Sequence, residues 1–500
     1  MTAAVDHDVV IIGAGFGGMG AAIELKRQGY HDILIVERED DLGGTWHVNH
    51  YPGLAVDIPS VTYSYSFEPN PYWSRLFAPG PELKRYALHV ADKYDLHRHM
   101  RFGTAVEGAR WEEDEGRPGA GHWVINLAGG ETVTARYVVA ATGYLSQPYR
   151  PEIPGIDSFA GDVLHTAKWD DDYDLSGKRV AVIGTGATAV QLIPEVAKLA
   201  AEMTVYQRTP IYVTAKNDFA IPKSVQRVFA RFPITQRAAR LVSTSVLELL
   251  MVAGVLRYRQ LRRFNERAGQ LAIRNMKHHI KDPELREKLT PNYSFGCKRP
   301  TFSNDFYPTF NLPHVHLETT PIERFDTDGI VTSDGNKTTI DTLVLATGYN
   351  IWDVNFPAFE VIGREGRDLG KWWRDNRFCA YEGVSVPLFP NLLILASPYS
   401  YSGLSYFTTI EYQMTHIGRL FGELHRKKAS TFEVTEKANE DFLDRMAVLL
   451  GDSVFYNGNC GPARSYYFNQ HGEAAVLRPT STYNTRREAN SFPLTDYQFS

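Results

Sequence analysis

The chain repeats one pattern of hydrophobic and polar positions. Short β-branched runs end at glycines and pass into stretches with helical periodicity, at residues 8–25 and again at residues 179–193. A segment rich in hairpin signals follows each copy, with turns at Gly129-Gly130 in the first and at Asp328-Gly329 and Asp334-Gly335 in the second. Each segment then ends in an apolar run and the letters ATGY, at residues 138–144 and 343–349. The pattern predicts an α/β fold in which one supersecondary unit occurs twice.

The first glycine turn has the spacing GxGxxG, at Gly13, Gly15 and Gly18. A strand that turns sharply into a helix directs free backbone N–H groups and the positive helix end toward a pyrophosphate, and glycines let the ligand approach closely. Glu37 closes the next apolar run, where a carboxylate binds a ribose 2′-hydroxyl. The first copy therefore favours FAD or NAD, whereas a tight turn without a ligand is the alternative.

The second glycine turn reads GxGxxA, at Gly184, Gly186 and Ala189. Glu37 lies 24 residues after Gly13, and the same offset from Gly184 reaches Arg208. A guanidinium at this position suits a 2′-phosphate, which indicates NADPH. The alternative is that Arg208 is an ordinary surface arginine.

Composition excludes several classes. The 500 residues are 43% hydrophobic and 22% charged, which is typical of globular chains, and about 150 residues per domain gives a prior of three domains. The net charge of −5 does not favour nucleic acid as a partner. Residues 1–8 contain no secretory signal, and the only cysteines are Cys297, Cys379 and Cys460. Their spacing predicts no metal site and no disulfide framework, and we expect a cytoplasmic location.

Residues 223–290 have a helical pattern and carry 15 Lys/Arg against 5 Asp/Glu. This basic charge suits the steering of a polyanionic cofactor or contact with an anionic membrane surface, and solvated helix faces are the third interpretation. The longest apolar run, Val246–Leu256, is interrupted by Glu248. It is shorter than the roughly 20 residues that span a bilayer, so we expect a buried or surface helix and no stable membrane insertion.

Two further segments carry candidate chemistry. Residues 43–57 read GGTWHVNHYPGLAVD and end in Asp57, which is either a half-buried carboxylate that needs a cationic partner or a turn or N-cap aspartate. Residues 293–300 read YSFGCKRP and place Lys298 and Arg299 between a glycine and a proline. A solvated basic loop is the alternative interpretation of that pair.

Residues 159–169, FAGDVLHTAKW, resemble the FxGxxxHxxxW fingerprint of type I Baeyer–Villiger monooxygenases. The match falls on Phe159, Gly161, His165 and Trp169, and residues 43–57 also match the family pattern GGxWxxxxYPGxxxD. Related N-hydroxylating flavin monooxygenases usually carry Tyr or Phe in place of Trp169. The resemblance extends over residues 7–425 and makes His165 part of a connector between cofactor domains, not a general base.

The resemblance implies two Rossmann-like dinucleotide-binding domains. Residues 1–150 and 335–500 form a discontinuous FAD domain, residues 151–175 form the connector with the fingerprint, and residues 176–222 and 291–334 form the NADPH domain. Residues 223–290 form a helical insertion that caps the active site, with Val246–Leu256 lining substrate access.

The activity implied by the resemblance is the conversion of a ketone to an ester or lactone. NADPH reduces FAD, and the reduced flavin and O₂ form a C4a-peroxide that adds to the ketone through an anionic tetrahedral intermediate. By the same resemblance Arg299 faces the peroxyflavin, Asp57 contacts Arg299, and Lys298 holds the 2′-phosphate with Arg208 and Thr209. The remaining cofactor-binding residues implied in this way are Gly44, Thr45, Trp46, Tyr63, Gly348 and Leu404.

Three alternatives stay open. The same peroxyflavin would perform sulfoxidation or N-oxygenation, a simpler flavoprotein would act as an NADPH oxidase, and a non-catalytic chain would be a flavin-binding sensor. Disulfide reductases share the repeat but need a redox cysteine pair, which the cysteine spacing does not predict. Tyr406 replaces an asparagine common in the family, and residues 466–468 (YYF) are either pocket-lining or core. The sequence specifies neither the ketone nor the oligomeric state.

Overall fold

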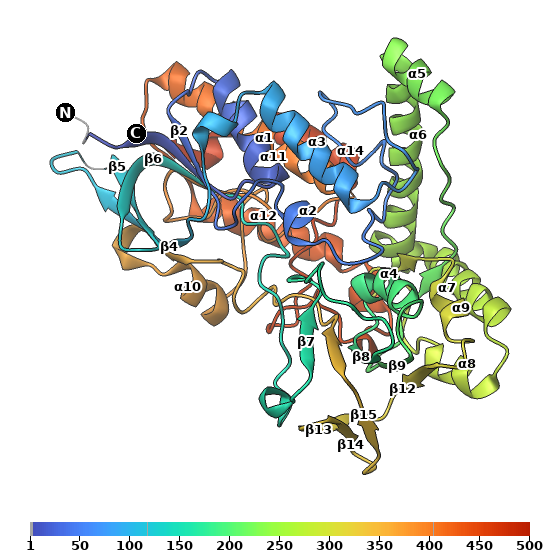
Figure 1. The fold of residues 1–500 in the computed structure, drawn as a ribbon. Helices are drawn as coiled ribbons and strands as arrows, with labels where there is room; N and C mark the ends of the chain where they lie inside the picture. Colours follow the sequence, from blue (N-terminus) through green and yellow to red (C-terminus); the bar gives the residue numbers. More distant parts are fainter. Residues whose placement is uncertain (1–3, 118, 404) are drawn as a thin grey trace.

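The computed structural model describes residues 4–117, 119–403 and 405–500, so Leu404 lies outside the described residues. Its first sheet has the strand order β17-β4-β5-β6-β1-β2-β3, and β18 also pairs with β6 (Figure 1). The parallel strands β1, β2, β6 and β18 form its centre, and β4, β5 and β6 form an antiparallel meander. The strands are β1 (His7–Ile12), β2 (Ile33–Val36), β3 (Met100–Arg101), β4 (Val106–Glu113), β5 (Gly121–Leu127), β6 (Thr132–Ala140), β17 (Glu360–Ile362) and β18 (Leu392–Ile394).

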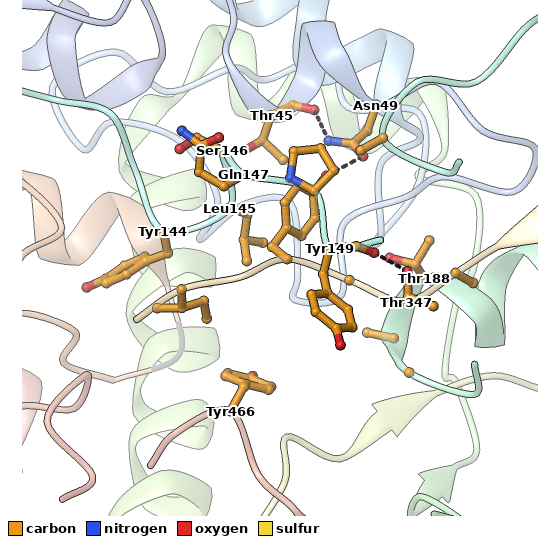
Figure 2. A pocket seen from close by; sticks show the side chains of 18 of the residues that line it. Thr45, Asn49, Tyr144, Leu145, Ser146, Gln147, Tyr149, Thr188, Thr347 and Tyr466 are labelled. Atoms are coloured by element: carbon orange, nitrogen blue, oxygen red, sulfur yellow. Dashed lines mark hydrogen bonds between the residues drawn. The ribbon is translucent and has the colours of Figure 1, made fainter. Parts of the chain in front are cut away.

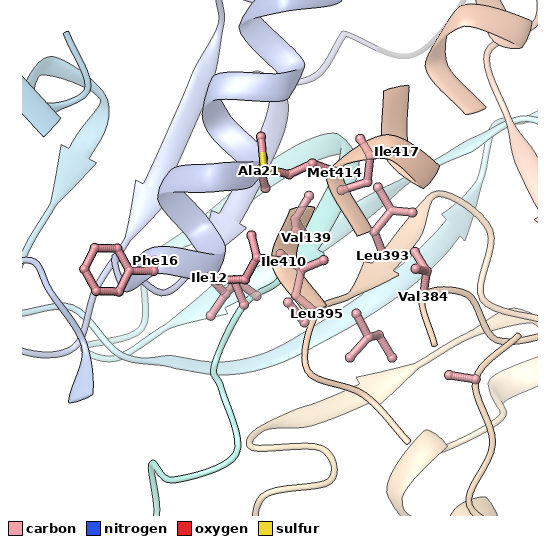
Figure 3. Close-up of a cluster of buried hydrophobic side chains, with 14 of the residues drawn as sticks. Ile12, Phe16, Ala21, Val139, Val384, Leu393, Leu395, Ile410, Met414 and Ile417 are labelled. Carbon is pink, nitrogen blue, oxygen red and sulfur yellow. The ribbon is translucent and has the colours of Figure 1, made fainter. Parts of the chain in front are cut away.

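The core of this first unit lies between the sheet and two long helices, α1 (Phe16–Arg27) and α11 (Tyr406–Lys427). Central strands covered on both faces are apolar at nearly every position, as residues 9–12 are. Figure 3 shows Ile410, Met414 and Ile417 of α11 beside side chains from α1 and the central strands. A Cβ at Gly20 would lie 2.8 Å from Ile410 Cγ2, so the glycine permits the close approach of the two helices.

The second sheet is entirely parallel, with the order β12-β9-β8-β16-β7. A three-stranded antiparallel meander, β13-β14-β15, precedes β16 as the hairpin signals predicted. The predicted repeat is therefore present, because each unit has a strand, a glycine turn, a helix, a meander and a final ATGY strand. The elements are β7 (Asp162–His165), β8 (Arg179–Ile183), α4 (Ala187–Val196), β9 (Glu202–Tyr206), α9 (Phe306–Thr309), β12 (Val315–Glu318), β13 (Ile322–Asp326), β14 (Gly329–Thr332), β15 (Lys337–Thr339) and β16 (Thr342–Leu345).

Strand pairing corrects two predicted boundaries. β16 pairs with β7 and β8, so the return to the first unit follows residue 345 and the predicted boundary at residue 335 is too early. β7 itself lies inside the predicted connector, residues 151–175, and is an edge strand of the second sheet. The error arose because ATGY ends a strand in both units, and the sequence pattern did not reveal which sheet the second ATGY strand joins. We propose residues 162–345 as the second unit, including its helical insertion.

The insertion is helical as predicted. It contains α5 (Lys223–Arg231), α6 (Pro233–Met251), a π-helical turn (Val252–Leu256), α7 (Tyr258–His279) and α8 (Pro283–Leu289). Helix α6 and the π-helical turn together make one apolar helix of 24 residues, long enough by length and composition to cross a membrane. The apolar run predicted from the sequence, Val246–Leu256, is only the second half of that helix.

The remaining elements complete the first unit and the interface with the insertion. They are α2 (Thr45–Val48), α3 (Gly80–Lys93), β10 (Val213–Thr214), β11 (Thr301–Phe302), α10 (Leu369–Asp375), β19 (Phe432–Val434), α12 (Glu436–Leu450), α13 (Val454–Asn457), α14 (Thr482–Ser491) and β20 (Tyr497–Phe499), with short 3₁₀ turns at residues 97–99, 156–158, 364–366, 461–463 and 494–496.

A buried ion-pair network fixes the C-terminal segment. The guanidinium of Arg478 is fully buried and contacts both Glu382 and Glu488, and Arg445 contacts the same two carboxylates. Burial by itself disfavours the charge on Arg478, but Glu382 and its other neighbours outweigh burial and raise the pKa above its usual range. The network joins α14 and the chain before it to α12 and to the segment after α10.

We expect Arg478→Met to lower the free energy of unfolding by about 3 kcal/mol, because the substitution leaves buried carboxylates with fewer partners. Chemical denaturation followed by circular dichroism measures the change. The matched control is Arg150→Met, whose ion pair with Asp157 is exposed and whose loss should cost less than about 1 kcal/mol. Equal, small effects of both substitutions would contradict a structural role for the network.

Candidate functional site

One large cavity, of about 1820 Å³, runs along both glycine turns. A pocket for a single small ligand usually measures about 300–1,000 Å³, so this cavity has room for more than one such molecule. Figure 2 shows residues of both units around it, with Thr45 and Asn49 from the first unit, Thr188 and Thr347 from the second, and Tyr466 from the C-terminal segment. The candidate site is therefore shared between the units.

The first glycine turn is shaped by close contacts of the backbone. Gly13 has a φ of +109°, and a Cβ there would lie 2.6 Å from the carbonyl oxygen of Ala141. A Cβ at Gly18 would lie 1.9 Å from the Gly13 carbonyl oxygen, so a side chain at either position would displace backbone. A Cβ at Gly44 would come within 3.0 Å of the Gly15 Cα, which brings the loop of residues 43–57 against the same turn. This cradle fits the pyrophosphate of a dinucleotide.

Other predicted residues of the first unit lie around the cradle. Glu37 is buried at the end of β2 and accepts hydrogen bonds from the backbone N–H of Ala14, at 2.7 Å, and of Glu39, at 3.1 Å. Trp46 Nε1 donates to the Tyr63 hydroxyl at 3.1 Å, and both rings line the cavity. Thr45 lines it as the first residue of α2. These groups supply carboxylate, hydroxyl and aromatic surface, which fits a flavin nucleotide.

The second glycine turn has the same construction. Gly184 has a φ of +118°, and a Cβ there would lie 2.4 Å from the Ala346 carbonyl oxygen. Apart from its chain neighbours, no atom of the described residues lies within 4 Å of a Cβ built at Gly186, and Ala189 is fully buried in the first turn of α4. Gly348, with a φ of +77°, lines the cavity at the end of the second ATGY strand. The free space at Gly186 is available to a ligand at the start of α4.

Three cations meet in the cavity beside the second turn. Burial and the neighbouring Arg208 and Arg464 lower the pKa of Lys298 to about 8. All three side chains line the cavity, and within the part of the chain that the structure describes none of them forms an ion pair with a carboxylate. Thr209 is buried beside them and lines the same wall. Like charges held together without anionic partners fit a polyanionic group such as a 2′-phosphate.

Arg464 is a member of this group that the sequence did not predict. It follows a 3₁₀ turn in the C-terminal segment, which matches the family patterns only loosely. The one available signal was that Arg464 is close in sequence to residues 466–468, which the sequence analysis described as either pocket-lining or core. Tyr466 and Tyr467 line the cavity, whereas Phe468 packs against Phe455.

Asp57 and Arg299 form a bidentate ion pair between the two units. Arg299 Nε donates to Asp57 Oδ2 at 2.9 Å and Nη2 donates to Oδ1 at 3.0 Å. Nη1 donates to the Tyr401 hydroxyl at 2.9 Å, and all three residues line the cavity. Burial opposes the charge on the arginine, but Asp57 outweighs it and raises the pKa of Arg299 well above its usual range. The alternative that Asp57 caps a helix is wrong, since no helix begins there.

The fingerprint residues lie outside the cavity and pack against the second unit. Phe159 packs edge-on against Phe325, with ring centroids 5.9 Å apart, and a Cβ at Gly161 would lie 2.4 Å from the Asp341 carbonyl oxygen. Trp169 is buried in the core of the second unit. His165 is the last residue of β7, and burial lowers its pKa. Its ring Nε2 lies 3.3 Å from the Tyr149 carbonyl oxygen. The ring thus bridges the second sheet and the segment that leaves the first.

The loop of residues 43–57 also contacts α4 directly. The Tyr51 hydroxyl donates to Gln191 Oε1 at 3.1 Å, and Gln191 Nε2 donates to the Ala55 carbonyl oxygen at 2.9 Å. A Cβ at Gly53 would lie 2.6 Å from the Gln191 carbonyl oxygen. Sequence reasoning missed Gln191, because one glutamine within a helix gives no signal of a partner 140 residues away.

The structure contradicts two predictions about this region. Cys297 and Cys460 form a disulfide with Cα atoms 5.2 Å apart, although the spacing predicted no disulfide framework. The bond joins the loop that carries Lys298 and Arg299 to the C-terminal segment, and neither sulfur lines the cavity. The second error concerns Val246–Leu256, none of which is among the described residues that line the cavity.

The chain is similar to known proteins over almost its whole length. A family model described as pyridine nucleotide-disulphide oxidoreductase matches residues 7–242, which contain no cysteine. A protein of Streptomyces coelicolor named Baeyer-Villiger monooxygenase is 36% identical over 98% of this chain and 92% of its own length. A protein of the same name from Pseudomonas aeruginosa is 37% identical over 98% of this chain and 90% of its own.

The chain is also similar to solved structures over almost its whole length. The chain resembles an oxidized steroid monooxygenase bound to NADP with a TM-score of 0.86 and 29% identity, over 99% of both chains. It resembles a cyclohexanone monooxygenase from Rhodococcus bound to NADP⁺ with a TM-score of 0.86 and 28% identity, again over 99% of both. A structure named OTEMO in complex with FAD and NADP matches with a TM-score of 0.86 at 26% identity.

We expect Arg208→Ala to raise the Michaelis constant for NADPH by about tenfold to a hundredfold, the usual loss for one charge-assisted hydrogen bond. The constant for NADH, which lacks the 2′-phosphate, should change little. Steady-state kinetics with both reductants measures the difference. An equal effect on the two constants would remove Arg208 from the phosphate site.

Lys298 should make NADP⁺ binding depend on pH. Its pKa of about 8 means that the ammonium group is present below that pH and is lost as the pH rises above it. The dissociation constant of NADP⁺ should therefore increase through this range, while that of NAD⁺ should stay constant. Lys298→Arg should flatten the profile, because an arginine keeps its proton. Calorimetric titration measures both constants, and an unchanged profile in the variant would contradict the assignment.

Proposed function

Because the chain belongs to the Baeyer–Villiger monooxygenase family, we propose that it converts a ketone and O₂ to an ester or lactone at the Asp57–Arg299 pair. The family predicted from the two fingerprints is confirmed, and so are the enzyme class and the cofactors FAD and NADPH. What we propose is the class of substrate and the roles of Asp57 and Arg299. The observation that supports it best is a paired arginine in a cavity that both glycine turns share.

When bound, FAD takes a hydride from NADPH and activates O₂ for insertion beside the carbonyl carbon. Negative charge then develops on oxygen atoms of the reacting ketone. A fixed cation in a partly dehydrated place stabilises that charge more strongly than water does, because the local dielectric is low and the group is already oriented. Arg299, with 21% of its side chain exposed, is such a cation.

Asp57 and Tyr401 orient the guanidinium. Asp57 accepts from Nε and Nη2, and Tyr401 accepts from Nη1. A guanidinium has five N–H groups, so these three bonds leave two for an oxygen of the substrate. Asp57 therefore acts as a positioning residue in our proposal, and Arg299 as the catalytic residue.

The ketone should have an apolar body. Tyr401, Tyr466 and Tyr467 surround Arg299 and line the cavity with aromatic surface. Rings of this kind favour a hydrophobic substrate with one polar group, which the arginine then orients. A cytoplasmic location stays a prediction, and the Cys297–Cys460 disulfide removes the cysteine argument for it. We propose no nucleic-acid partner.

We expect Arg299→Ala to keep the reduction of FAD by NADPH but to lower the yield of oxygenated ketone product about a hundredfold or more, the usual cost of removing a group that stabilises an oxyanion. Stopped-flow absorbance of the flavin measures the first step, and mass spectrometry of the product measures the second. Arg257→Ala is the matched control, since this arginine pairs with Asp452 outside the cavity.

The same assay separates the alternatives. An ester or lactone from the wild type supports the proposal. Hydrogen peroxide alone would indicate an NADPH oxidase, oxygenation of sulfides or amines but not ketones would indicate a different monooxygenase, and no turnover would indicate a sensor. Wild-type product yield in Arg299→Ala would overturn the role of that residue.

A further inference from the structure

The helix formed by α6 and the π-helical turn has its apolar side toward solvent. Only 28% of its most apolar 18-residue stretch is buried. We call the exposed apolar residues of α6 its outer face. Leu241, Val242 and Leu249 are 68%, 64% and 62% exposed, values typical of charged side chains and rare for aliphatic ones. The outer face consists of Ile234, Leu241, Val242, Val246, Leu249 and Leu250.

The opposite side of α6 is polar and is fixed to the first unit. Gln236 Nε2 donates to the Asn70 carbonyl oxygen at 2.6 Å, and Arg240 Nη1 donates to the Ser64 carbonyl oxygen at 2.8 Å. Farther along the helix, the backbone N–H of Thr482 donates to Glu248 at 2.8 Å. These bonds hold α6 in its orientation, so the outer face cannot turn inward. They also tie the helix to the rest of the chain, so a membrane span would have to break them.

Helix α5 extends the apolar surface and adds positive charge. Val225 and Val228 of α5, and Phe232 between α5 and α6, are exposed. Figure 1 shows α5 at the free end of α6, at one edge of the molecule. Residues 223–247 contain no acidic residue. Four exposed cations accompany the apolar side chains, and within the described part of the chain none of them has an ion-pair partner: Lys223, Arg227, Arg231 and Arg237.

We propose that the outer face of α6, with α5, docks on the surface of an anionic membrane. Aliphatic and phenylalanine side chains on one side of a basic helix enter the boundary between head groups and acyl chains, while the cations meet lipid phosphates. A second copy of the chain is a poorer occupant. A contact between two copies would join two surfaces of positive charge, since residues 223–247 contain no acidic residue to pair with the cations of the other copy, and the repulsion would oppose association.

Vesicle co-sedimentation of the FAD-loaded full chain tests the proposal. The probes are vesicles of phosphatidylcholine alone and vesicles of phosphatidylcholine with phosphatidylglycerol. We expect the wild type to bind the anionic vesicles at least about tenfold more tightly than the neutral ones, and to lose this preference in concentrated salt. Wild-type protein that fails to sediment with anionic vesicles at low salt would overturn the proposal.

Two variants and one control locate the contact. Leu241→Ser with Leu249→Ser should weaken binding by about tenfold or more, because two side chains no longer enter the bilayer. Arg227→Glu with Arg231→Glu should do the same through charge. Val448→Ser, on α12, removes an aliphatic residue that is even more exposed, at 77%, and should leave binding unchanged. Flavin content and circular dichroism verify that each variant is folded.

Three results would contradict the proposal. One is wild-type vesicle binding by both folded double variants. Another is an equal loss in Val448→Ser. The last is a wild-type dimer in light scattering that Leu241→Ser with Leu249→Ser dissociates, without vesicle binding, which would assign the outer face to a second copy. The readouts do not involve ketone turnover, so they are independent of the proposed function.

Discussion

The ion pair between Asp57 and Arg299 is the interaction on which the arrangement of the site depends. The two residues are 242 positions apart and belong to loops of different units, so the pair forms only when the units meet. A half-buried guanidinium without a carboxylate would carry an uncompensated charge. The same loops are held from other sides, since residues 51–55 contact Gln191 on α4 and Cys297 is bonded to Cys460. Both cofactor turns and the C-terminal segment are thereby brought to one cavity.

Lys298, the residue beside Arg299, has the opposite electrostatic environment. Lys298 has no carboxylate partner among the described residues and instead lies near Arg208 and Arg464, and burial with these two cations lowers its pKa to about 8. A protein pays for such a cluster in stability unless an anion binds it. In our proposal the two consecutive cations have different tasks, because Arg299 has a carboxylate partner and is a fixed charge, whereas Lys298 has none among the described residues and binds a ligand. The dipeptide sequence does not distinguish them, since only their neighbours differ.

The parts of the fold that the sequence predicts correctly are those set by local sterics. Gly13 and Gly18 are five residues apart and contact each other across the turn, so the spacing alone carries their geometry. Asp57 and Arg299 lacked any such local signal, and their association was expected only through the family resemblance. The place of Arg464 and the Cys297–Cys460 bond are set by contacts between segments that are far apart in the sequence. The spacing of residues within one segment gives no information on such contacts. The boundary near β16 failed for the same reason, because two similar strands end alike and only their partners assign them.

Helix α6 shows how a correct helix prediction leaves its orientation open. The pattern of polar and apolar positions is ordinarily interpreted with the apolar side inward. Here the polar side is needed inward, because residues 61–70 contain no regular element and Arg240 and Gln236 supply donors for their backbone carbonyl groups. Satisfying these buried acceptors turns the aliphatic side chains outward. The exposure of these side chains is thus a consequence of how α6 packs. Exposed apolar side chains either cost free energy through their contact with water or are covered by another apolar surface. The exposed cations of α5 have no ion-pair partner among the described residues, and together with the exposed aliphatic side chains they favour the anionic lipid surface that we propose.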